Sequence, residues 1–538
     1  MVFARRSTTL LAAIIASCAM VLSLTACTSD NKTVVDGQTT VTSNSAGGVA
    51  VFTPSDGITL NQQTPLNKWA KLVPDLAKAL ADAGFKKGDI NHTTSDSLDK
   101  QSRAIQDFVV DHLSNNTTDD SGIAIAPDNM TLLVAPVVEA DASTRQYGDY
   151  VSQNLSTNDV TDEGATSDGE SSEDDSSNTE SDSTASDEQA QAVDRLVSSL
   201  KLAKESGMHV VLLGNSIEGY KPDAFVKFSD AQTIGKLQAE KMVSKLKLDK
   251  ASKDNPKYIE VLLPYTAMDE KGNANDSTFA QEAFRGIWQV LGSYYQKGVV
   301  ESPSGTLDGK STENDWQAVA YDAAKEGSTA KVLDKRLAKT DGQSTLTRID
   351  GIITMNDYIA SEVVKELDDL GYTGSAADIN PQITISGIVG NITGKKDLSR
   401  DAVPDPIKSP ENDNANDSSS SDDDADKDTS ASDKDRDSQW PLVTGYGAYV
   451  SNIPSIVNGK QWMTGMEDRQ TIATDIAQAC AKLNKDEALN SMPSIRNSEV
   501  GGVKKIPTIS EPLLAVSASN LKSALIDPGY ISLADAGL

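Results

Sequence analysis

Short apolar runs alternate with helical periodicity along most of this 538-residue chain, and this alternation constrains the fold most strongly. Residues 49–52, 210–213 and 351–355 are dominated by apolar side chains, whereas residues 66–84 and 277–293 place such side chains three and four positions apart. Continuous apolar strands between amphipathic helices are typical of parallel sheets that carry helices on both faces. One such sheet rarely accommodates this many units, so the sequence predicts an α/β chain with two doubly wound lobes. Ligands in such folds bind beyond the carboxyl ends of the strands, so we expect a site between the lobes.

The first 27 residues have the pattern of a secretory signal that ends in a lipobox. Arg5 and Arg6 precede an apolar run over residues 10–24, and Thr25-Ala26-Cys27 follows. This run is shorter than the roughly 20 apolar residues that a spanning helix needs. We therefore expect cleavage after residue 26 and a diacylglyceryl group on the Cys27 sulfur. The mature chain would be anchored by lipid on the extracytoplasmic face of the cell membrane. Residues 27–47 are rich in Ser, Thr, Asn and Gly, and they predict a flexible tether.

Two segments rich in Asp and Ser account for much of the formal net charge of −30. Residues 159–188 hold twelve acidic side chains and no Lys or Arg, and residues 405–437 hold twelve acidic and four basic side chains. Neither segment has enough apolar residues to offset the entropy lost on ordering. We therefore predict two disordered acidic insertions, over about 156–190 and 402–438. The chain has no basic stripe that could neutralise phosphates, which argues against nucleic acid as a partner.

The remaining polar residues give no sign of catalysis. Once the signal is removed and Cys27 carries lipid, Cys480 is the last cysteine, so no internal disulfide can form. His92, His112 and His209 lie far apart without the spacing of metal ligands. The chain also lacks a phosphate-binding glycine loop and a nucleophile elbow. We therefore expect no enzyme activity, no metal and no cofactor.

Several short motifs follow one another in a characteristic order from about residue 49 to the end. They are Lys68-Trp69, residues 226–230 and 234–239, Trp316, Met355-Asn356-Asp357, residues 459–464, and residues 525–530. In this order they resemble the type I periplasmic sugar-binding proteins of ABC transporters, particularly the xylose- and multiple-sugar-binding branch. The two acidic insertions interrupt the resemblance.

The resemblance implies the type I periplasmic-binding-protein fold, in which three crossovers join two lobes. The crossovers are expected near residues 225–229, 445–461 and 507–516. The implied lobes are an amino-terminal one, comprising residues 48–226 and 461–490, and a carboxy-terminal one, comprising residues 227–460 and 491–538.

The resemblance also implies a set of ligand-binding residues between the lobes. In this family charged and amide side chains bind sugar hydroxyls, and aromatic rings stack on the apolar faces of the sugar. The candidates here are Trp69, Asn275, Trp316, Asn356, Asp357 and Gln461. Two of these positions have another interpretation: Asn356-Asp357 is also a typical helix cap, and Trp69 also fits the apolar face of its helix.

Several positions at which the family carries charged contacts differ in this chain. They read Gly214-Asn215, Ser229-Asp230, Phe284, Ile388-Val389 and Glu467. Each buried hydroxyl left without a partner costs roughly 1–3 kcal/mol, so two or three losses would weaken binding of an ordinary pentose or hexose a thousandfold or more.

Two functions from different classes follow from these observations. The first is a monomeric, lipid-anchored solute-binding protein that captures a carbohydrate or similar small polar ligand for the permease subunits of an ABC importer. The alternative is a surface lipoprotein outside transport that keeps the scaffold as a sensor or interaction module. The family motifs favour the first function, and the lost charged contacts favour the second.

Overall fold

The computed structural model describes residues 46–55, 65–115, 125–138, 144–156, 180–268, 275–323, 325–338, 346–376 and 438–538. The signal sequence, Cys27, the second acidic insertion and Ile388-Val389 lie outside these residues. Within the described part, no helix is long and apolar enough to cross a membrane.

The first sheet has seven strands in the order β15-β16-β7-β5-β3-β1-β2. All neighbouring pairs are parallel except β15 and β16, which run antiparallel. The strands are β1 (Gly48–Pro54), β2 (Ile90–Ser95), β3 (Met130–Val134), β5 (His209–Leu213), β7 (Ala224–Lys227), β15 (Ile495–Val500) and β16 (Val503–Ser510).

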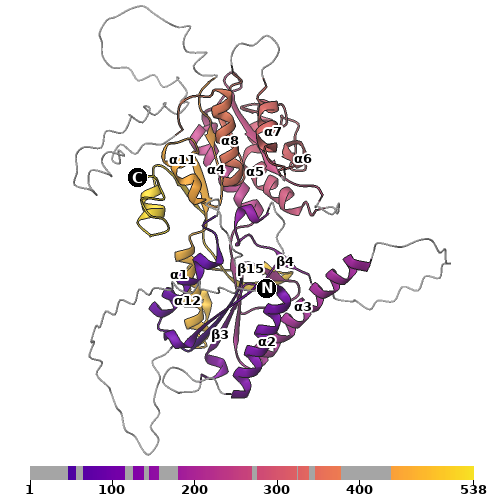
Figure 1. Ribbon diagram of the computed structural model, residues 1–538, viewed down its shortest axis with the longest axis vertical. Coiled ribbons are helices and arrows are strands. Elements are labelled where there is room, and N and C mark those ends of the chain that lie inside the picture. Colours follow the sequence, from indigo (N-terminus) through magenta and orange to yellow (C-terminus); the bar gives the residue numbers. More distant parts are fainter. Residues whose placement is uncertain are drawn as a thin grey trace, which may run out of the picture. The chain divides into compact units, whose positions relative to one another are not determined.

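Alternate residues of the first sheet face two different hydrophobic cores. Val49 and Val51 pack with α1 (Trp69–Asp82) and α12 (Arg469–Leu483). Ala50 and Phe52 point to the opposite face, which α2 (Leu98–Asn115) and α3 (Glu180–Glu205) cover. Figure 1 shows α2 and α3 side by side, in agreement with their extensive mutual contacts. The sheet is therefore doubly wound, as a continuous apolar strand requires.

The second sheet has four parallel strands in the order β10-β8-β12-β13. They are β10 (Val300–Glu301), β8 (Lys257–Val261), β12 (Gly351–Ile353) and β13 (Leu442–Val443). Ile259 and Ile353 face the core shared with α4 (Ala231–Leu246) and α5 (Thr278–Gln296). On the other face, Ile352 packs with α7 (Ser328–Arg336) and α8 (Asp357–Leu370). Two doubly wound parallel sheets are present, which confirms the predicted fold class.

Glycine allows α4 and α5 to pack closely. A Cβ atom on Gly235 would lie 2.2 Å from the Ala283 carbonyl oxygen, and one on Gly286 would lie 2.0 Å from the Gln232 carbonyl oxygen. Any side chain at either position would push the two helices apart.

Shorter elements complete the chain. The two-stranded pairs are β4 (Asn154–Leu155) with β6 (Ser216–Ile217), β9 (Leu263–Pro264) with β11 (Ala320–Tyr321), and β14 (Met463–Met466) with β17 (Leu514–Ser517). The short helices are α6 (Trp316–Val319) and α11 (Ile453–Val457).

Two sequence-based boundaries are corrected by the structure. Residues 491–538 were assigned to the carboxy-terminal lobe, but β15 and β16 extend the first sheet, with Thr508 opposite Phe225. The cause is the parallel pairing of β16 with β7, which brings Ile509 into the core under α12. The first acidic insertion was predicted to lack structure up to about residue 190, but α3 already begins at Glu180.

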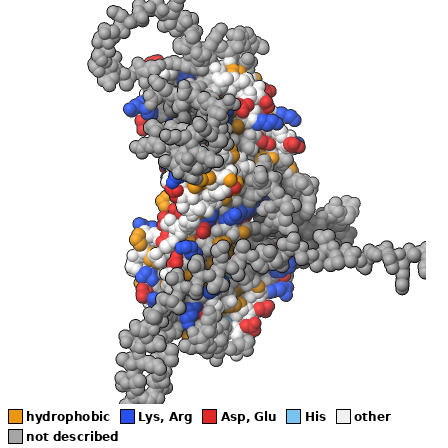
Figure 2. Space-filling model, turned by 60° about the vertical axis from the view of Figure 1, so that its left-hand side comes forward, with side chains coloured by type: hydrophobic (Ala, Val, Ile, Leu, Met, Phe, Trp, Pro, Cys, Tyr) orange, Lys and Arg blue, Asp and Glu red, His pale blue; other side chains and the backbone are white. Residues whose placement is uncertain are grey.

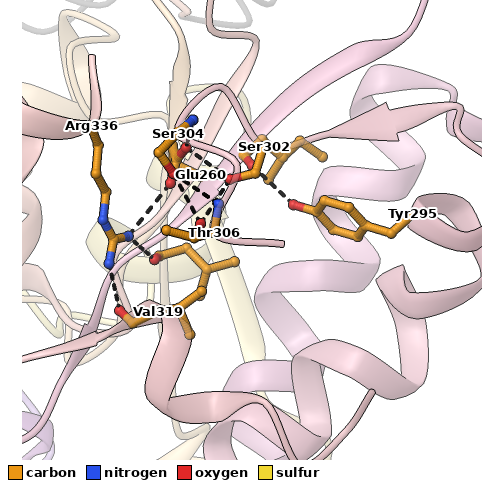
Figure 3. A network of polar contacts seen from close by, with 9 residues as sticks. Glu260, Tyr295, Ser302, Ser304, Thr306, Val319 and Arg336 are labelled. Atoms are coloured by element: carbon orange, nitrogen blue, oxygen red, sulfur yellow. Dashed lines mark hydrogen bonds and ion pairs between the residues drawn. The ribbon is translucent and has the colours of Figure 1, made fainter. Parts of the chain in front are cut away.

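A buried polar network joins strands and helix on one side of the second sheet (Figure 3). Glu260 of β8 is fully buried and accepts hydrogen bonds from the Ser302 hydroxyl and the Ser304 amide, each at 2.8 Å. Arg336, at the end of α7, lies 3.5 Å from the other Glu260 oxygen and donates to the Val261 and Val319 carbonyls. Burial lowers the pKa of Arg336, although the carboxylate opposes this shift.

The described surface shows no concentration of one charge on the face drawn in Figure 2. Lys and Arg side chains are interspersed there with Asp and Glu side chains. The described side chains that are visible there therefore form no extended basic track.

Candidate functional site

The carboxyl ends of the first sheet carry an aromatic cluster around Trp69. Trp69 begins α1 and is 2% exposed. Its ring contacts Tyr150 and Phe228 edge to face, with ring centroids 5.1 and 5.7 Å apart. A Cβ atom on Gly214 would lie 3.6 Å from the Trp69 ring, so the loop after β5 also borders the cluster. Trp69 is thus packed inside the chain, as the core interpretation of this residue predicts.

Asn356, the first polar residue after β12 that the sequence singled out, caps a helix. Its side-chain oxygen accepts a hydrogen bond from the Ile359 amide at 2.9 Å, at the start of α8. Its side-chain nitrogen donates to the Gln146 side-chain oxygen at 3.1 Å. One half of the amide therefore stabilises the helix, and the other half is directed at a residue that follows β3.

Asp357 is the centre of a closed hydrogen-bond network. The side chain is fully buried, and one carboxylate oxygen accepts from the Gln461 side-chain nitrogen at 2.7 Å. The other accepts from the Tyr449 amide at 2.9 Å and the Thr464 hydroxyl at 2.8 Å. Burial raises the pKa of Asp357 to about 6, and these hydrogen bonds oppose the shift. The carboxylate joins α8 to the chain between β13 and β14.

Gln461 belongs to the same network. Its side-chain nitrogen donates to Asp357 and to the Met463 carbonyl, and its oxygen accepts from the Asn452 side chain at 2.8 Å. Asn452 also donates to the Asp357 carbonyl at 2.7 Å. The structure therefore brings together Asp357 and Gln461, two residues that the resemblance assigns to ligand binding, and here they bind each other and nearby backbone.

Trp316 and Asn275 form a second group beside Tyr265, which follows β9. The Trp316 and Tyr265 rings meet edge to face with centroids 5.1 Å apart. The Asn275 side chain donates to the Thr266 carbonyl at 2.8 Å, and the Tyr265 hydroxyl donates to the Asn275 carbonyl at 3.2 Å. The Asn275 side chain is thus bonded to the chain itself, and Trp316 is 9% exposed.

Tyr446 also belongs to the candidate site, although no sequence pattern was assigned to it. The expected contacts at Ile388-Val389 lie outside the described residues, and β13, which pairs with β12, ends at Val443. Tyr446 follows that strand, and its hydroxyl forms a short hydrogen bond with Ser229, which follows β7. The signal in the sequence was the apolar run 441–443 before a Gly-Tyr-Gly turn.

Glu467 is a buried acid at the same place. It is 1% exposed and accepts from the Ser229 amide at 2.6 Å, with the Tyr446 hydroxyl 3.4 Å away. Its own amide lies 3.4 Å from the Asn67 side-chain oxygen. Burial raises the pKa of Glu467 to about 7, against the effect of the Ser229 hydrogen bonds, and nearby Asp230 adds to the rise.

We expect Glu467→Gln to remove a loss of stability that the parent shows as the pH rises from 5 to 8. A carboxyl whose folded pKa is raised stabilises the fold fully below its unfolded pKa, and this contribution is lost as the pH rises through the folded pKa. The amide can still accept from Ser229 but cannot ionise. In urea unfolding, the variant should gain on the order of 2 kcal/mol relative to the parent between pH 5 and pH 8. Asp357 retains its own pH dependence near pH 6 in both proteins. If the difference in unfolding free energy between variant and parent is the same at pH 5 and pH 8, Glu467 is not a buried ionisable group.

Comparisons with known proteins give similarity in structure only. No family model matches the chain, and no curated protein matches it. An ABC transporter solute-binding protein from Clostridium phytofermentans with bound β-D-glucose aligns at 16% identity and a TM-score of 0.44, over 91% of this chain and 99% of its own. A carbohydrate transporter solute-binding protein from Chloroflexus aurantiacus, in complex with D-glucose, aligns at 17% identity and a TM-score of 0.44, over 92% and 98%. A periplasmic ribose ABC transporter from Conexibacter woesei aligns at 13% identity and a TM-score of 0.43, over 90% and 96%.

Proposed function

We propose that this chain is a lipid-anchored extracytoplasmic solute-binding protein of an ABC importer. It captures a carbohydrate or similar small polar ligand between its two parallel-sheet lobes, and it belongs with the type I periplasmic sugar-binding proteins that its motifs resemble. The observation that carries the proposal is the meeting of strand ends from both sheets. Ser229 lies two residues after β7 of the first sheet, and its side chain forms a short hydrogen bond with the hydroxyl of Tyr446, which lies three residues after β13 of the second.

The side chains at this meeting place have the chemistry that a sugar requires. A hydroxyl donates one hydrogen bond and accepts others, so amides, carboxylates and hydroxyls can satisfy it. Asn356, Ser229 and Glu467 provide one of each. Tyr446 adds an aromatic ring, which can pack against the apolar face of a small molecule.

The test of the proposal is calorimetry of the mature chain against D-xylose, D-glucose, D-galactose, L-arabinose and D-ribose, with a thermal-shift screen over other sugars and nucleosides. At least one compound should raise the unfolding midpoint, because a ligand that prefers the folded state stabilises it. We expect none of the five sugars to bind with submicromolar affinity, since several charged contacts of the family are replaced. The absence of any stabilising compound would contradict a solute-binding function.

The alternative function, a sensor or interaction module outside transport, is favoured by one observation. Asp357 and Gln461, two of the predicted ligand-binding residues, are fully buried and bind each other. A scaffold that no longer binds a ligand could retain such a network for stability alone. Failure of every compound in the screen would favour this function.

Anchoring by lipid makes a separate prediction. Cys27→Ser should release the folded protein from the membrane fraction, because we propose that the lipid on this residue is its hydrophobic anchor. Fractionation and immunoblotting would measure the distribution, and Cys480→Ser is the matched control that should remain membrane-bound. A Cys27→Ser variant that still sediments with membranes after a salt wash would overturn the proposed anchor.

A further inference from the structure

Residues 144–155, here called the β3–β5 segment, contact the candidate residues on both sheets. We propose that this segment occupies the place of the ligand, so that a ligand binds only when the segment leaves. The inference rests on the proposed function and adds an internal competitor to it. The evidence consists of contacts to the first sheet, contacts to the second sheet, and the backbone between them.

Toward the first sheet, the segment is held by Asp149 and Tyr150. The Asp149 carboxylate accepts from the Lys68 ammonium at 2.7 Å and from the Trp69 amide at 3.1 Å. The Tyr150 ring packs against both Trp69 and Phe228, and its hydroxyl donates to the Lys68 carbonyl at 2.5 Å. The aromatic surface of Trp69, which the sequence assigned to a ligand, is thus covered by a side chain of the protein itself.

Toward the second sheet, the segment is held by Gln146 and Tyr147. Gln146 accepts from the Asn356 side chain at 3.1 Å, and its carbonyl accepts from the Tyr449 hydroxyl at 2.6 Å. The Tyr147 ring is 1% exposed and lies 4.7 Å from Phe279 and 6.3 Å from Tyr446, measured between ring centroids. The Asn356 side-chain nitrogen, which could otherwise donate to a ligand hydroxyl, therefore donates to the Gln146 side-chain oxygen.

Gly148 lets the segment face both sheets. It has a φ of +98°, and a Cβ atom there would lie 2.6 Å from the Asn67 carbonyl oxygen. A positive φ at this position is favourable only for glycine. Tyr147 packs in the core of the second sheet, and Tyr150 packs in the core of the first. The turn thus places one ring against each sheet. Gly148 itself lies close to the backbone of Asn67, which precedes α1.

An internal occupant lowers the apparent affinity for a free ligand. If the site is vacated in a fraction of the molecules, the apparent dissociation constant equals the intrinsic constant divided by that fraction. Water reaches some of the contacts at the edges of the segment. The Lys68 and Asp149 side chains are 17% and 20% exposed, and Gln146 is half-buried. Gln146 and Asn356 share one neutral hydrogen bond.

The test compares Gln146→Ala/Tyr147→Ala with the parent and with Tyr294→Ala/Gln296→Ala. The control removes the same side-chain types from α5, where Tyr294 is half-buried and Gln296 is exposed. Hydrogen exchange reports on the amides of Asp149, Ser152 and Gln153, which are hydrogen-bonded in the parent. Calorimetry against the five sugars reports on the site, and exchange of the β3 amides confirms that the first sheet remains folded.

We expect exchange of the three segment amides to be at least tenfold faster in Gln146→Ala/Tyr147→Ala and unchanged in the control. The affinity for at least one of the five sugars should rise at least tenfold. Unchanged exchange, or faster exchange with sugar affinity equal to that of a sugar-binding parent, would overturn the inference. Faster exchange with no sugar bound by any of the three proteins would support a removable segment and contradict the proposed function.

Discussion

Asp357→Ala is expected to lower the free energy of unfolding by about 3–5 kcal/mol. The substitution leaves the Gln461 side-chain nitrogen, the Thr464 hydroxyl and the Tyr449 amide without their acceptor, and all three contacts are buried. Each orphaned buried donor costs roughly 1–3 kcal/mol, and the costs within one network do not simply add. Urea unfolding at neutral pH, followed by circular dichroism, measures the change.

The control for this prediction is Asp369→Ala. Asp369 lies on the same helix and is exposed, so its replacement should change stability by less than about 0.5 kcal/mol. If Asp357→Ala costs no more than this control, the network around Asp357 does not hold α8 to the chain between β13 and β14.

Arg336→Met is expected to destabilise the protein by about 3–5 kcal/mol, because it leaves Glu260 buried without its cationic partner. The Arg336 side chain is 8% exposed and that of Glu260 is 0% exposed. The double variant Glu260→Gln/Arg336→Met should recover much of the loss, since the amide oxygen can still accept from Ser302 and Ser304 while the charge is gone. Lys335→Met, at an exposed neighbouring position, is the matched control.

Urea unfolding under one set of conditions measures the free energy of unfolding of the parent, Arg336→Met, Glu260→Gln/Arg336→Met and Lys335→Met. A double variant as unstable as Arg336→Met would show that the lost hydrogen bonds to Val261 and Val319, and not the unpaired charge, cause the effect. A loss below about 1 kcal/mol in the single variant would contradict the burial of the pair.

The fold class could be predicted from the sequence because buried parallel strands have a strong local pattern. Residues 49–52 and 210–213 consist of apolar residues, and they form the larger parts of β1 and β5. The return of β15 and β16 to the first sheet had no such signal. Residues 503–505 carry Lys504 and Lys505, and the antiparallel edge pair mixes exposed with buried positions.

The site could be predicted only where local preferences decide it. The preference of Asn for helix N-caps is local, and it correctly gives one of the two roles of Asn356. The partners of Asp357 could not be predicted in this way, because Gln461 and Thr464 lie 104 and 107 residues further along the chain. The role of the β3–β5 segment was missed for the same reason. Its contacts reach Lys68 in one direction and Tyr449 in the other.

Two of the positions at which the chain departs from the family that its motifs resemble, Ser229 and Glu467, have partners within the chain itself. If Gln146, Tyr147 and Tyr150 occupy the site, charged side chains that would bind sugar hydroxyls are not needed there. The Glu467 carboxylate instead accepts a hydrogen bond from the Ser229 amide, and the Ser229 hydroxyl is hydrogen-bonded to the Tyr446 hydroxyl. The polar groups of these residues thus have hydrogen-bond partners within the chain, whereas in an open sugar site such groups would bind the ligand or water.

The most direct test of this account is hydrogen exchange of the unmodified protein with and without the sugar that binds best among D-xylose, D-glucose, D-galactose, L-arabinose and D-ribose. A bound ligand usually slows exchange of the backbone around it. The account predicts the opposite for the β3–β5 segment: the amides of Asp149, Ser152 and Gln153 should exchange faster when the sugar is bound, because the sugar displaces them. Slower or unchanged exchange of these amides in a sugar-saturated protein would contradict the account.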